Sequence, residues 1–162
     1  MLTSLVKRWL TGLLLAVVVL LVIVFGSQIA LTIVVTIFSV GGVWEYNNIV
    51  FEKNGYRKEK IEGFFFAVAV PFIMLCGNSQ LVLAVLAFCV LITFIIFLGS
   101  IQKQRLDVLA VAKVVFGIMY IPFLMSHFIL LRGLPQGALW VLFVLMLAIA
   151  GDIVALYTGK YF

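Results

Sequence analysis

Six long apolar runs, separated by short polar breaks, constrain the fold of this chain more than any other feature. A helix needs about 20 mostly apolar residues to cross roughly 30 Å of hydrocarbon, and several of the runs approach that length. The predicted spans are Leu10–Phe25, Ile29–Tyr46, Ile61–Leu75, Leu81–Leu98, Leu109–Leu131 and Ala138–Tyr157. The breaks "GSQ" and "GNSQ" predict tight turns between successive helices. We therefore predict an all-α, polytopic helical membrane protein with about six transmembrane helices.

The composition excludes an ordinary soluble domain. The 162 residues are 66% hydrophobic and only 10% charged, with a mean hydropathy of +1.34. A soluble chain of this size needs far more polar surface to cover its core. The runs are uniformly apolar, whereas the strands of a membrane β-barrel alternate polar and apolar residues. No hydrophilic stretch is long enough for a separate domain, so residues 1–162 are interpreted as a single membrane domain.

The distribution of Lys and Arg predicts the orientation of the spans. Eight basic residues fall on one side of the predicted topology: Lys7, Arg8, Lys53, Arg57, Lys58, Lys60, Lys103 and Arg105. The opposite side has only Arg132. Because cytoplasmic loops carry the excess of basic residues, we expect a cytoplasmic N-terminus and a multi-pass protein of the cell's inner (cytoplasmic) membrane. With six spans, the last helix also ends in the cytoplasm.

The basic segment "FEKNGYRKEKIEG" has two interpretations. Topology and solvation are sufficient to explain its charge, and the net charge of +5 is interpreted in the same way, with no nucleic-acid partner expected. The functional alternative is a surface attracted to anionic lipid headgroups, at ~1 kcal/mol per basic residue near the membrane. We expect the acids Glu52, Glu59 and Glu62 to weaken that attraction.

The last apolar run contains an acid, Asp152, with Lys160 about two turns later. At ~100° per residue, Asp152, Ala155 and Gly159 share one face of a helix. Gly151, Ala155 and Gly159 recur at every fourth position, a spacing that lets another helix or a ligand approach the backbone closely. A lipid-facing Asp costs roughly 2.5–3.5 kcal/mol. We therefore predict that Asp152 faces protein, water or a metal ion.

A phosphate-binding site would use these two charges in different ways. A carboxylate repels phosphate, so Asp152 would hold Mg²⁺ or another divalent cation, which prefers carboxylate and phosphate oxygens. Lys160 would contact a phosphate as a point charge. The structural alternatives are that Asp152 pairs with a nearby cation or lies at the interface, and that Lys160 is an anchor at the end of the helix.

Several motifs, in matching order, resemble one family. The stretch "GDIVALYTGKYF" follows the pattern D-x-x-A-x-x-x-G-[KR]-x-F and resembles the motif of integral-membrane phosphatidate cytidylyltransferases, also called CDP-diacylglycerol synthases. Upstream, "KRWLTGLLLA" resembles the family's opening and first helix, and "VWEYNNI" resembles the end of its second helix. The segment before the last helix, "YIPFLMSHFILLRGLP", is similar to the family in its general residue pattern. The C-terminal motif, "GDIVALYTGKYF", also resembles that of CTP-dependent polyprenol kinases such as dolichol kinase. The two N-terminal motifs favour the cytidylyltransferases.

The resemblance implies a reaction, a site and a set of partners. Such enzymes transfer the CMP unit of CTP to phosphatidate in phospholipid biosynthesis, giving CDP-diacylglycerol and pyrophosphate. It assigns Asp152 to the metal and nucleotide site, Gly159 to the nucleotide site and Lys160 to phosphate. The implied partners are CTP, phosphatidate, membrane lipid and Mg²⁺ or another divalent cation, and a homodimer is implied as well. Gly151 and Leu156 depart from the residues that are common at these positions of the motif.

The resemblance also bears on the length of the chain. The family continues well beyond the position of Phe162, so we expect the 162 residues to be an incomplete part of a longer enzyme, without appreciable transferase activity by themselves. Detection of CTP-dependent CDP-diacylglycerol synthesis by the purified chain would contradict this expectation. The non-enzymatic alternative is a small membrane bundle in which Asp152 is a structural or ion-pathway residue.

Other residues in the apolar runs have structural interpretations beside functional ones. Glu45 is interpreted as an acid at the membrane interface beside Trp44. The functional alternative is that Glu45 orients a cation in the site, such as Lys113. Lys113 is interpreted as a snorkelling residue, whose long side chain carries its charge to the membrane interface. His127 has no second ligand nearby in the sequence, which argues against a metal site. Pro71 and Pro122 should each kink a helix, because proline removes an internal hydrogen bond.

Overall fold

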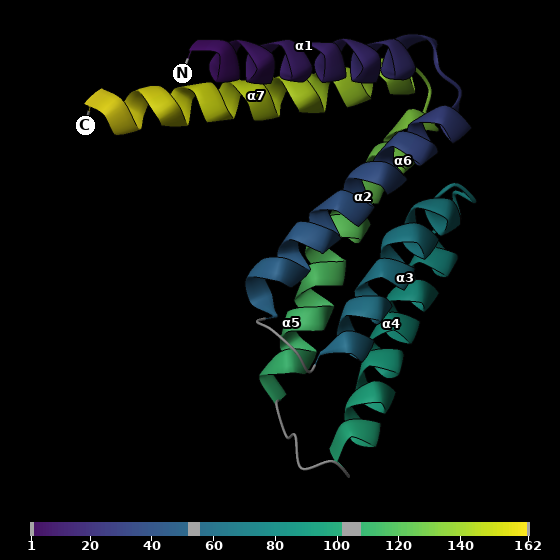
Figure 1. Cartoon of the computed structure of the whole chain (residues 1–162). Helices are drawn as coiled ribbons and strands as arrows, with labels where there is room; N and C mark the ends of the chain where they lie inside the picture. Colours follow the sequence, from purple (N-terminus) through teal and green to yellow (C-terminus); the bar gives the residue numbers. More distant parts are fainter. Residues whose placement is uncertain (1, 52–55, 102–107, 162) are drawn as a thin grey trace. The chain divides into compact units, whose positions relative to one another are not determined.

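The structure is a computed structural model that describes residues 2–51, 56–101 and 108–161, and its regular elements there are all helices (Figure 1). They are α1 (Leu2–Phe25), α2 (Gln28–Val50), α3 (Arg57–Met74), α4 (Ser79–Ile101), α5 (Val108–Ile118), the π-helical turn η1 (Met119–Phe123), α6 (Leu124–Arg132) and α7 (Gly137–Tyr161). Because α5, η1 and α6 follow one another without a break, the described residues form six helical rods. The predicted all-α fold is confirmed.

Four helical segments of the described chain are long and apolar enough to cross a membrane. They are Gln28–Val50, Gln80–Gly99, Leu109–Arg132 and Gly137–Lys160. The apolar part of α1 is shorter, Leu10–Phe25, and α3 has a charged first turn. The chain is therefore a polytopic helical membrane protein. The count of six spans and the cytoplasmic N-terminus stay predictions.

Several helices extend beyond the apolar runs that predicted them. Helix α1 begins at Leu2 rather than Leu10, and α3 begins at Arg57 rather than Ile61. Lys, Arg and Glu are good helix formers, so a helix continues through charged residues after the apolar run has ended. The second half of the basic segment is thus the first turn of α3, which places its charges at defined angles around a helix.

Both predicted breaks occur where the sequence places them. Between α3 and α4, Gly77 has a φ of +67°, in the left-handed region that glycine adopts without a steric penalty. The next residue, Asn78, accepts a hydrogen bond on Oδ1 from the backbone N–H of Gln80 at 2.9 Å. At the α1–α2 break, Ser27 Oγ accepts one from the N–H of Ala30 at 3.2 Å. Side-chain oxygens thus satisfy N–H groups at the start of both following helices.

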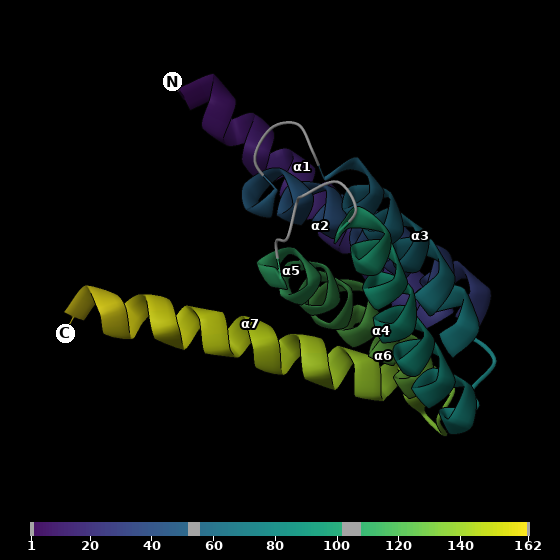
Figure 2. The same cartoon turned by 90° about the horizontal axis from the view of Figure 1, so that it is seen from below.

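The chain divides into two compact units, and the first is the central unit, Thr32–Leu130. Within it, α3 packs against α4, α5 and η1, and α4 packs against α5. Figure 2 views these helices from the end at which α3 and α5 begin. The buried apolar side chains of this unit come from α2, α3, α4 and α5 and include Val43, Phe66, Val70, Met74, Cys89, Val114 and Ile118. The central unit therefore has its own packed core.

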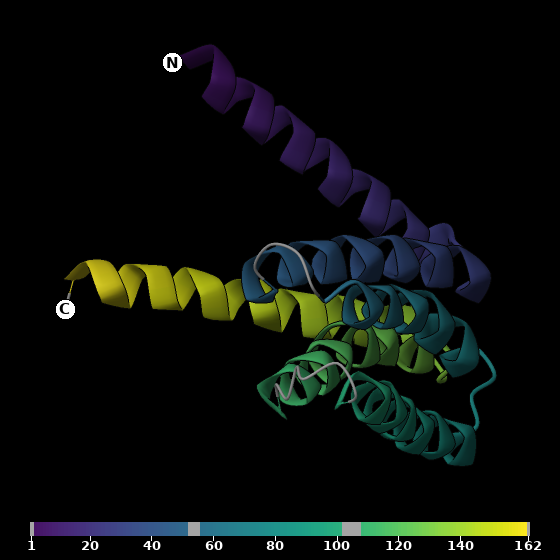
Figure 3. The same cartoon turned by 60° about the horizontal axis from the view of Figure 1, so that its bottom comes forward.

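The second, terminal unit consists of Met1–Leu31 and Leu131–Phe162. Helices α1 and α7 contact each other, and Figure 3 shows them spreading apart toward their free ends. The guanidinium of Arg132 donates a hydrogen bond to the carbonyl of Gly26 at 3.0 Å, which ties the two segments together. Every residue from Met146 to Lys160 is exposed within the chain. The C-terminal half of α7 is thus exposed within the terminal unit.

The two prolines lie inside helices that continue past them. Around Pro122 the helix adopts the π-helical turn η1, a wider turn that accommodates the missing N–H of proline. The hydroxyl of Ser126 donates to the carbonyl of Pro122 at 2.5 Å. Pro71 lies near the end of α3, which continues to Met74. The helical hydrogen-bond pattern thus changes at Pro122, whereas the predicted kinks at Pro71 and Pro122 stay predictions.

Candidate functional site

The three predicted site residues, Asp152, Gly159 and Lys160, all lie on the exposed half of α7. At a rise of 1.5 Å per residue, Asp152 and Lys160 are about 12 Å apart along the helix axis. They are separated by only about 80° around it, so both project from the same side. A triphosphate is long enough to approach both charges at once.

The surface between these charges is open. A Cβ atom placed on Gly151 or on Gly159 would meet no atom within 4 Å. The hydroxyl of Thr158 donates to the carbonyl of Val154 at 2.7 Å, so its polar group bonds to its own helix. The face that contains Asp152 therefore presents a carboxylate, a bare backbone stretch and an ammonium group to whatever approaches α7.

The donor set fits a divalent cation that shares its ligands with a substrate. Mg²⁺ is commonly bound by one or two carboxylates, with waters and substrate phosphates completing its shell. Asp152 supplies one such carboxylate. Among the described residues, no group of three or more His, Cys, Asp or Glu side chains lies close enough to hold a metal ion. An all-protein cage is therefore not built by this part of the chain, whereas a cation held partly by nucleotide oxygens suits it.

A second acid, Glu62, lies in the interior of the central unit. Its side chain is 5% exposed, and its Oε1 accepts a hydrogen bond from Thr93 Oγ1 at 2.5 Å, which links α3 to α4. Its Oε2 has no hydrogen-bond partner among the described residues. A buried polar group normally needs such partners. Glu62 is thus an interior residue between two helices, whereas the acid on α7, Asp152, is exposed.

Tyr46 joins α2 to α5 in the same unit. Its hydroxyl donates to the backbone carbonyl of Lys113 at 2.8 Å. Its ring packs so closely on Gly117 that a Cβ there would lie 2.6 Å from a ring carbon. The ammonium of Lys113 lies 3.5 Å from the carbonyl of Val50, at the C-terminus of α2, where a cation is favoured. Lys113 therefore contacts this helix end and not Glu45, which is exposed.

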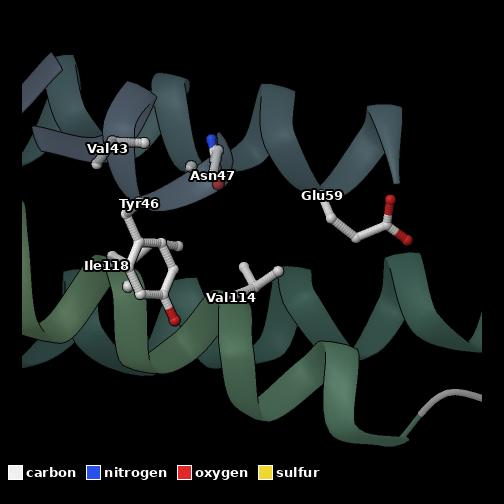
Figure 4. Close-up of a pocket in the computed structure, with 8 residues that line it drawn as sticks. Val43, Tyr46, Asn47, Glu59, Val114 and Ile118 are labelled. Atoms are coloured by element: carbon white, nitrogen blue, oxygen red, sulfur yellow. The ribbon is translucent and has the colours of Figure 1, made fainter. Parts of the chain in front are cut away.

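A small cavity lies between α2, α3 and α5 (Figure 4). The side chains around it include Val43, Tyr46, Asn47, Glu59, Val114 and Ile118. Its volume is about 10 Å³, roughly the space that one water molecule needs. Asn47 is 4% exposed, and its Nδ2 has no hydrogen-bond partner in the part of the chain that the structure describes. The cavity is far too small for a nucleotide, so it is not the candidate nucleotide site.

His127 contacts its own helix. Its Nδ1 lies 2.9 Å from the carbonyl of Phe123, and its ring meets the Phe123 ring edge-on with centroids 4.7 Å apart. These contacts account for the histidine without a metal ion.

Sequence reasoning singled out Asp152, whose role in a site stays a prediction, and missed the interior contacts of Tyr46, Glu62 and Thr93. Each is a polar residue in or beside an apolar run, which is the one signal that would have singled it out. The partners lie 31 and 67 positions apart in the chain, so their pairing depends on how the helices pack.

The cytidylyltransferase family matches residues 6–162, nearly the whole chain. The match includes α7 with Asp152, Gly159 and Lys160 as well as every helix of the central unit. No curated protein and no solved structure matches the chain.

Proposed function

The chain belongs to the cytidylyltransferase family, and we propose that it transfers the CMP unit of CTP to phosphatidate. Family membership supports a CTP-using nucleotidyltransferase activity, and the long apolar helices make it a membrane protein. The lipid acceptor is the further step. The products would be CDP-diacylglycerol and pyrophosphate, which makes this a reaction of phospholipid biosynthesis.

The observation that carries the proposal is a family match that includes an accessible acid on an apolar helix. An ionisable residue within a membrane helix is a functional-site hypothesis by default, because its burial in lipid is costly. Asp152 lies about 12 Å before Lys160, the last residue of the candidate span Gly137–Lys160. This depth suits a site that receives CTP from water and a lipid from the bilayer.

The three candidate site residues of α7 have different tasks in the proposed reaction. Asp152 binds the divalent cation, which when bound neutralises negative charge on the triphosphate. Lys160 holds a phosphate oxygen by a charge-assisted hydrogen bond. Gly159, which lacks a side chain, leaves the backbone accessible to the nucleotide. Together they orient CTP with its α-phosphorus toward the lipid phosphate.

The reaction balances without an external oxidant or proton store. An oxygen of the phosphatidate phosphate attacks the α-phosphorus of CTP and forms a new P–O–P linkage. The bond between the α-phosphorus and the bridging oxygen to the β-phosphate breaks, and pyrophosphate leaves. Charge accumulates on the triphosphate in this displacement, so preorganised positive groups beside it lower the barrier.

Two further parts of the proposal concern partners. A homodimer, which the resemblance to the phosphatidate cytidylyltransferases implies, remains part of the proposal. The inner (cytoplasmic) membrane is the proposed location, with α7 ending on the cytoplasmic side, where CTP is available.

Product analysis tests the proposal. Membranes containing the polypeptide expressed from its complete gene are incubated with Mg²⁺, CTP labelled at the α-phosphate, and either phosphatidate or a polyprenol. The proposal predicts labelled CDP-diacylglycerol and equimolar pyrophosphate with phosphatidate. A phosphorylated polyprenol with release of CDP would instead identify a CTP-dependent lipid kinase. Absence of any CTP-dependent product from either lipid, with the protein shown to be folded, would overturn both.

A further inference from the structure

Helix α3 has a continuous apolar stripe on its exposed side. Ile61, Phe65, Val68 and Phe72 are 58%, 59%, 45% and 46% exposed, respectively. They follow one another at intervals of four, three and four residues, so they line one side of the helix. No other described residue of the central unit buries this stripe, so it is available to the acyl chains of a bilayer.

Two exposed cations flank the start of this stripe. Arg57 and Lys58 are the first two residues of α3, and both are exposed. At ~100° per residue, the four stripe residues are centred about 50° from Arg57 in one direction and about 50° from Lys58 in the other. The two charges therefore lie on either side of the stripe, one turn beyond its first apolar residue.

The acids of this segment are turned away from the stripe. Glu59 is half-buried and is one of the residues around the cavity between α2, α3 and α5 (Figure 4). At ~100° per residue it lies about 150° around α3 from the centre of the stripe. Glu62 is buried and hydrogen-bonded to Thr93. The prediction that these acids weaken the attraction of the segment for anionic headgroups stays a prediction. Glu52 lies outside the described residues.

We propose that this face of α3 binds an anionic phospholipid. An acyl chain lies along Ile61, Phe65, Val68 and Phe72, and the headgroup phosphate lies between Arg57 and Lys58. The guanidinium of Arg57 suits bidentate bonding to phosphate, and Lys58 adds a point charge. A zwitterionic lipid can fill the stripe equally well but gains less from the two cations, so the site selects by headgroup charge.

The inference goes beyond the proposed reaction and does not depend on it. Retention of an anionic lipid needs no CTP, no divalent cation and no turnover, and it uses none of the residues of α7. The competing explanation is that Arg57 and Lys58 only set the orientation of the protein. That explanation predicts no preference of the stripe for one headgroup over another.

Quenching of a local indole by brominated lipids tests the proposal. Trp9, Trp44 and Trp140 are replaced by Phe, and Phe65→Trp places a single indole on the stripe. The protein is reconstituted in phosphatidylcholine vesicles, without CTP, that contain brominated phosphatidylglycerol or brominated phosphatidylcholine. We expect stronger quenching by phosphatidylglycerol. Neutralising Arg57 and Lys58 with Gln should reduce that preference about five-fold per cation, the equivalent of ~1 kcal/mol each.

Matched variants separate the site from a general charge effect. Lys7→Gln removes an exposed lysine on α1 and should leave the preference unchanged. Glu59→Gln should also change it by less than two-fold, because this acid lies on the far side of α3 from the stripe. The exchange Arg57→Lys with Lys58→Arg should retain it. Circular dichroism verifies that each variant is helical before quenching is measured.

Three results would overturn the proposal. The first is equal quenching by the two brominated lipids in the parent protein. The second is a preference that survives removal of both cations. The third is an indole that neither lipid quenches, which would show that protein, such as a second copy of the chain, covers the stripe. None of these results bears on the transferase activity, so failure here and failure of the proposed function are distinguishable.

Discussion

Polar groups in the central unit and on α7 have opposite surroundings. In the central unit, Tyr46 donates to the Lys113 carbonyl and Glu62 accepts from Thr93, so these polar groups bond to a neighbouring helix. On α7, Asp152 and Lys160 are exposed. The first kind of polar residue holds helices together, and the second kind is accessible to a ligand.

The glycines show the same difference. A Cβ on Gly117 would collide with the ring of Tyr46 at 2.6 Å, whereas a Cβ on Gly159 would meet nothing within 4 Å. Gly117 is therefore required by packing, and Gly159 is not. We therefore expect substitutions in the central unit to change stability and substitutions on α7 to change catalysis. The following predictions test that separation.

The largest expected effect is that of Asp152→Asn. Loss of the carboxylate removes the proposed cation ligand, and we expect CTP-dependent transfer to fall roughly 100-fold or more, as for other lost electrostatic contacts at reacting phosphates or oxyanions. Thermal unfolding in detergent should not change. Glu45→Gln, which removes an exposed acid from α2, is the matched control and should retain activity. Equal losses of transferase activity in Asp152→Asn and Glu45→Gln would contradict a specific role for Asp152.

Gly117→Ala should produce the largest loss of stability. The added methyl group meets the Tyr46 ring, and overpacking of this kind typically costs about 1–3 kcal/mol. In a chain of this length that corresponds to a lower melting temperature by roughly 2–4 °C per kcal/mol. Gly159→Ala is the paired variant: it should keep or slightly raise the melting temperature while lowering activity. A stability loss in Gly159→Ala alone would reverse the proposed roles.

Lys160→Gln should have a smaller effect on catalysis than Asp152→Asn. A charge-assisted hydrogen bond to phosphate contributes about 1.5–3 kcal/mol, so we expect at least a ten-fold loss in kcat/KM for CTP. Lys160→Arg should restore most of it, because the positive charge is kept. If Lys160 is only a helix-end anchor, then the Gln variant will have normal kinetics.

The smallest expected effect is that of Tyr46→Phe. Removal of the hydroxyl deletes one hydrogen bond to the Lys113 carbonyl, at a cost of about 1 kcal/mol of stability. The specific activity of the folded protein should be unchanged. Thermal unfolding and initial rates measured on one preparation check both statements, and a selective loss of activity would place Tyr46 near the reaction after all.

The helices were predictable because their signal is local. Apolar runs identified all six rods, and "GSQ" and "GNSQ" identified two of the breaks. The ends were less predictable: α3 begins at Arg57 because charged residues with good helix propensity continue a helix beyond its apolar part. Hydropathy reports where a helix enters an apolar medium, and it does not report where the helix starts.

The site was predictable only in part. Asp152 could be singled out because an acid in an apolar run is costly. The burial of Glu62 could not, because it depends on α4 placing Thr93 beside it from 31 positions away. The place of Glu59 beside the cavity likewise depends on the packing of α2, α3 and α5. Charges counted along the sequence therefore do not report which side of a helix each one occupies.

Binding of Mn²⁺ in the presence of CTP tests the central claim most directly, namely that Asp152 serves a metal–nucleotide site while interior acids serve packing. Electron paramagnetic resonance measures Mn²⁺ retained by the polypeptide from its complete gene, with and without CTP. We predict CTP-dependent binding that is lost in Asp152→Asn and retained in Glu62→Gln. Binding that persists in Asp152→Asn, or that disappears only in Glu62→Gln, would contradict the account.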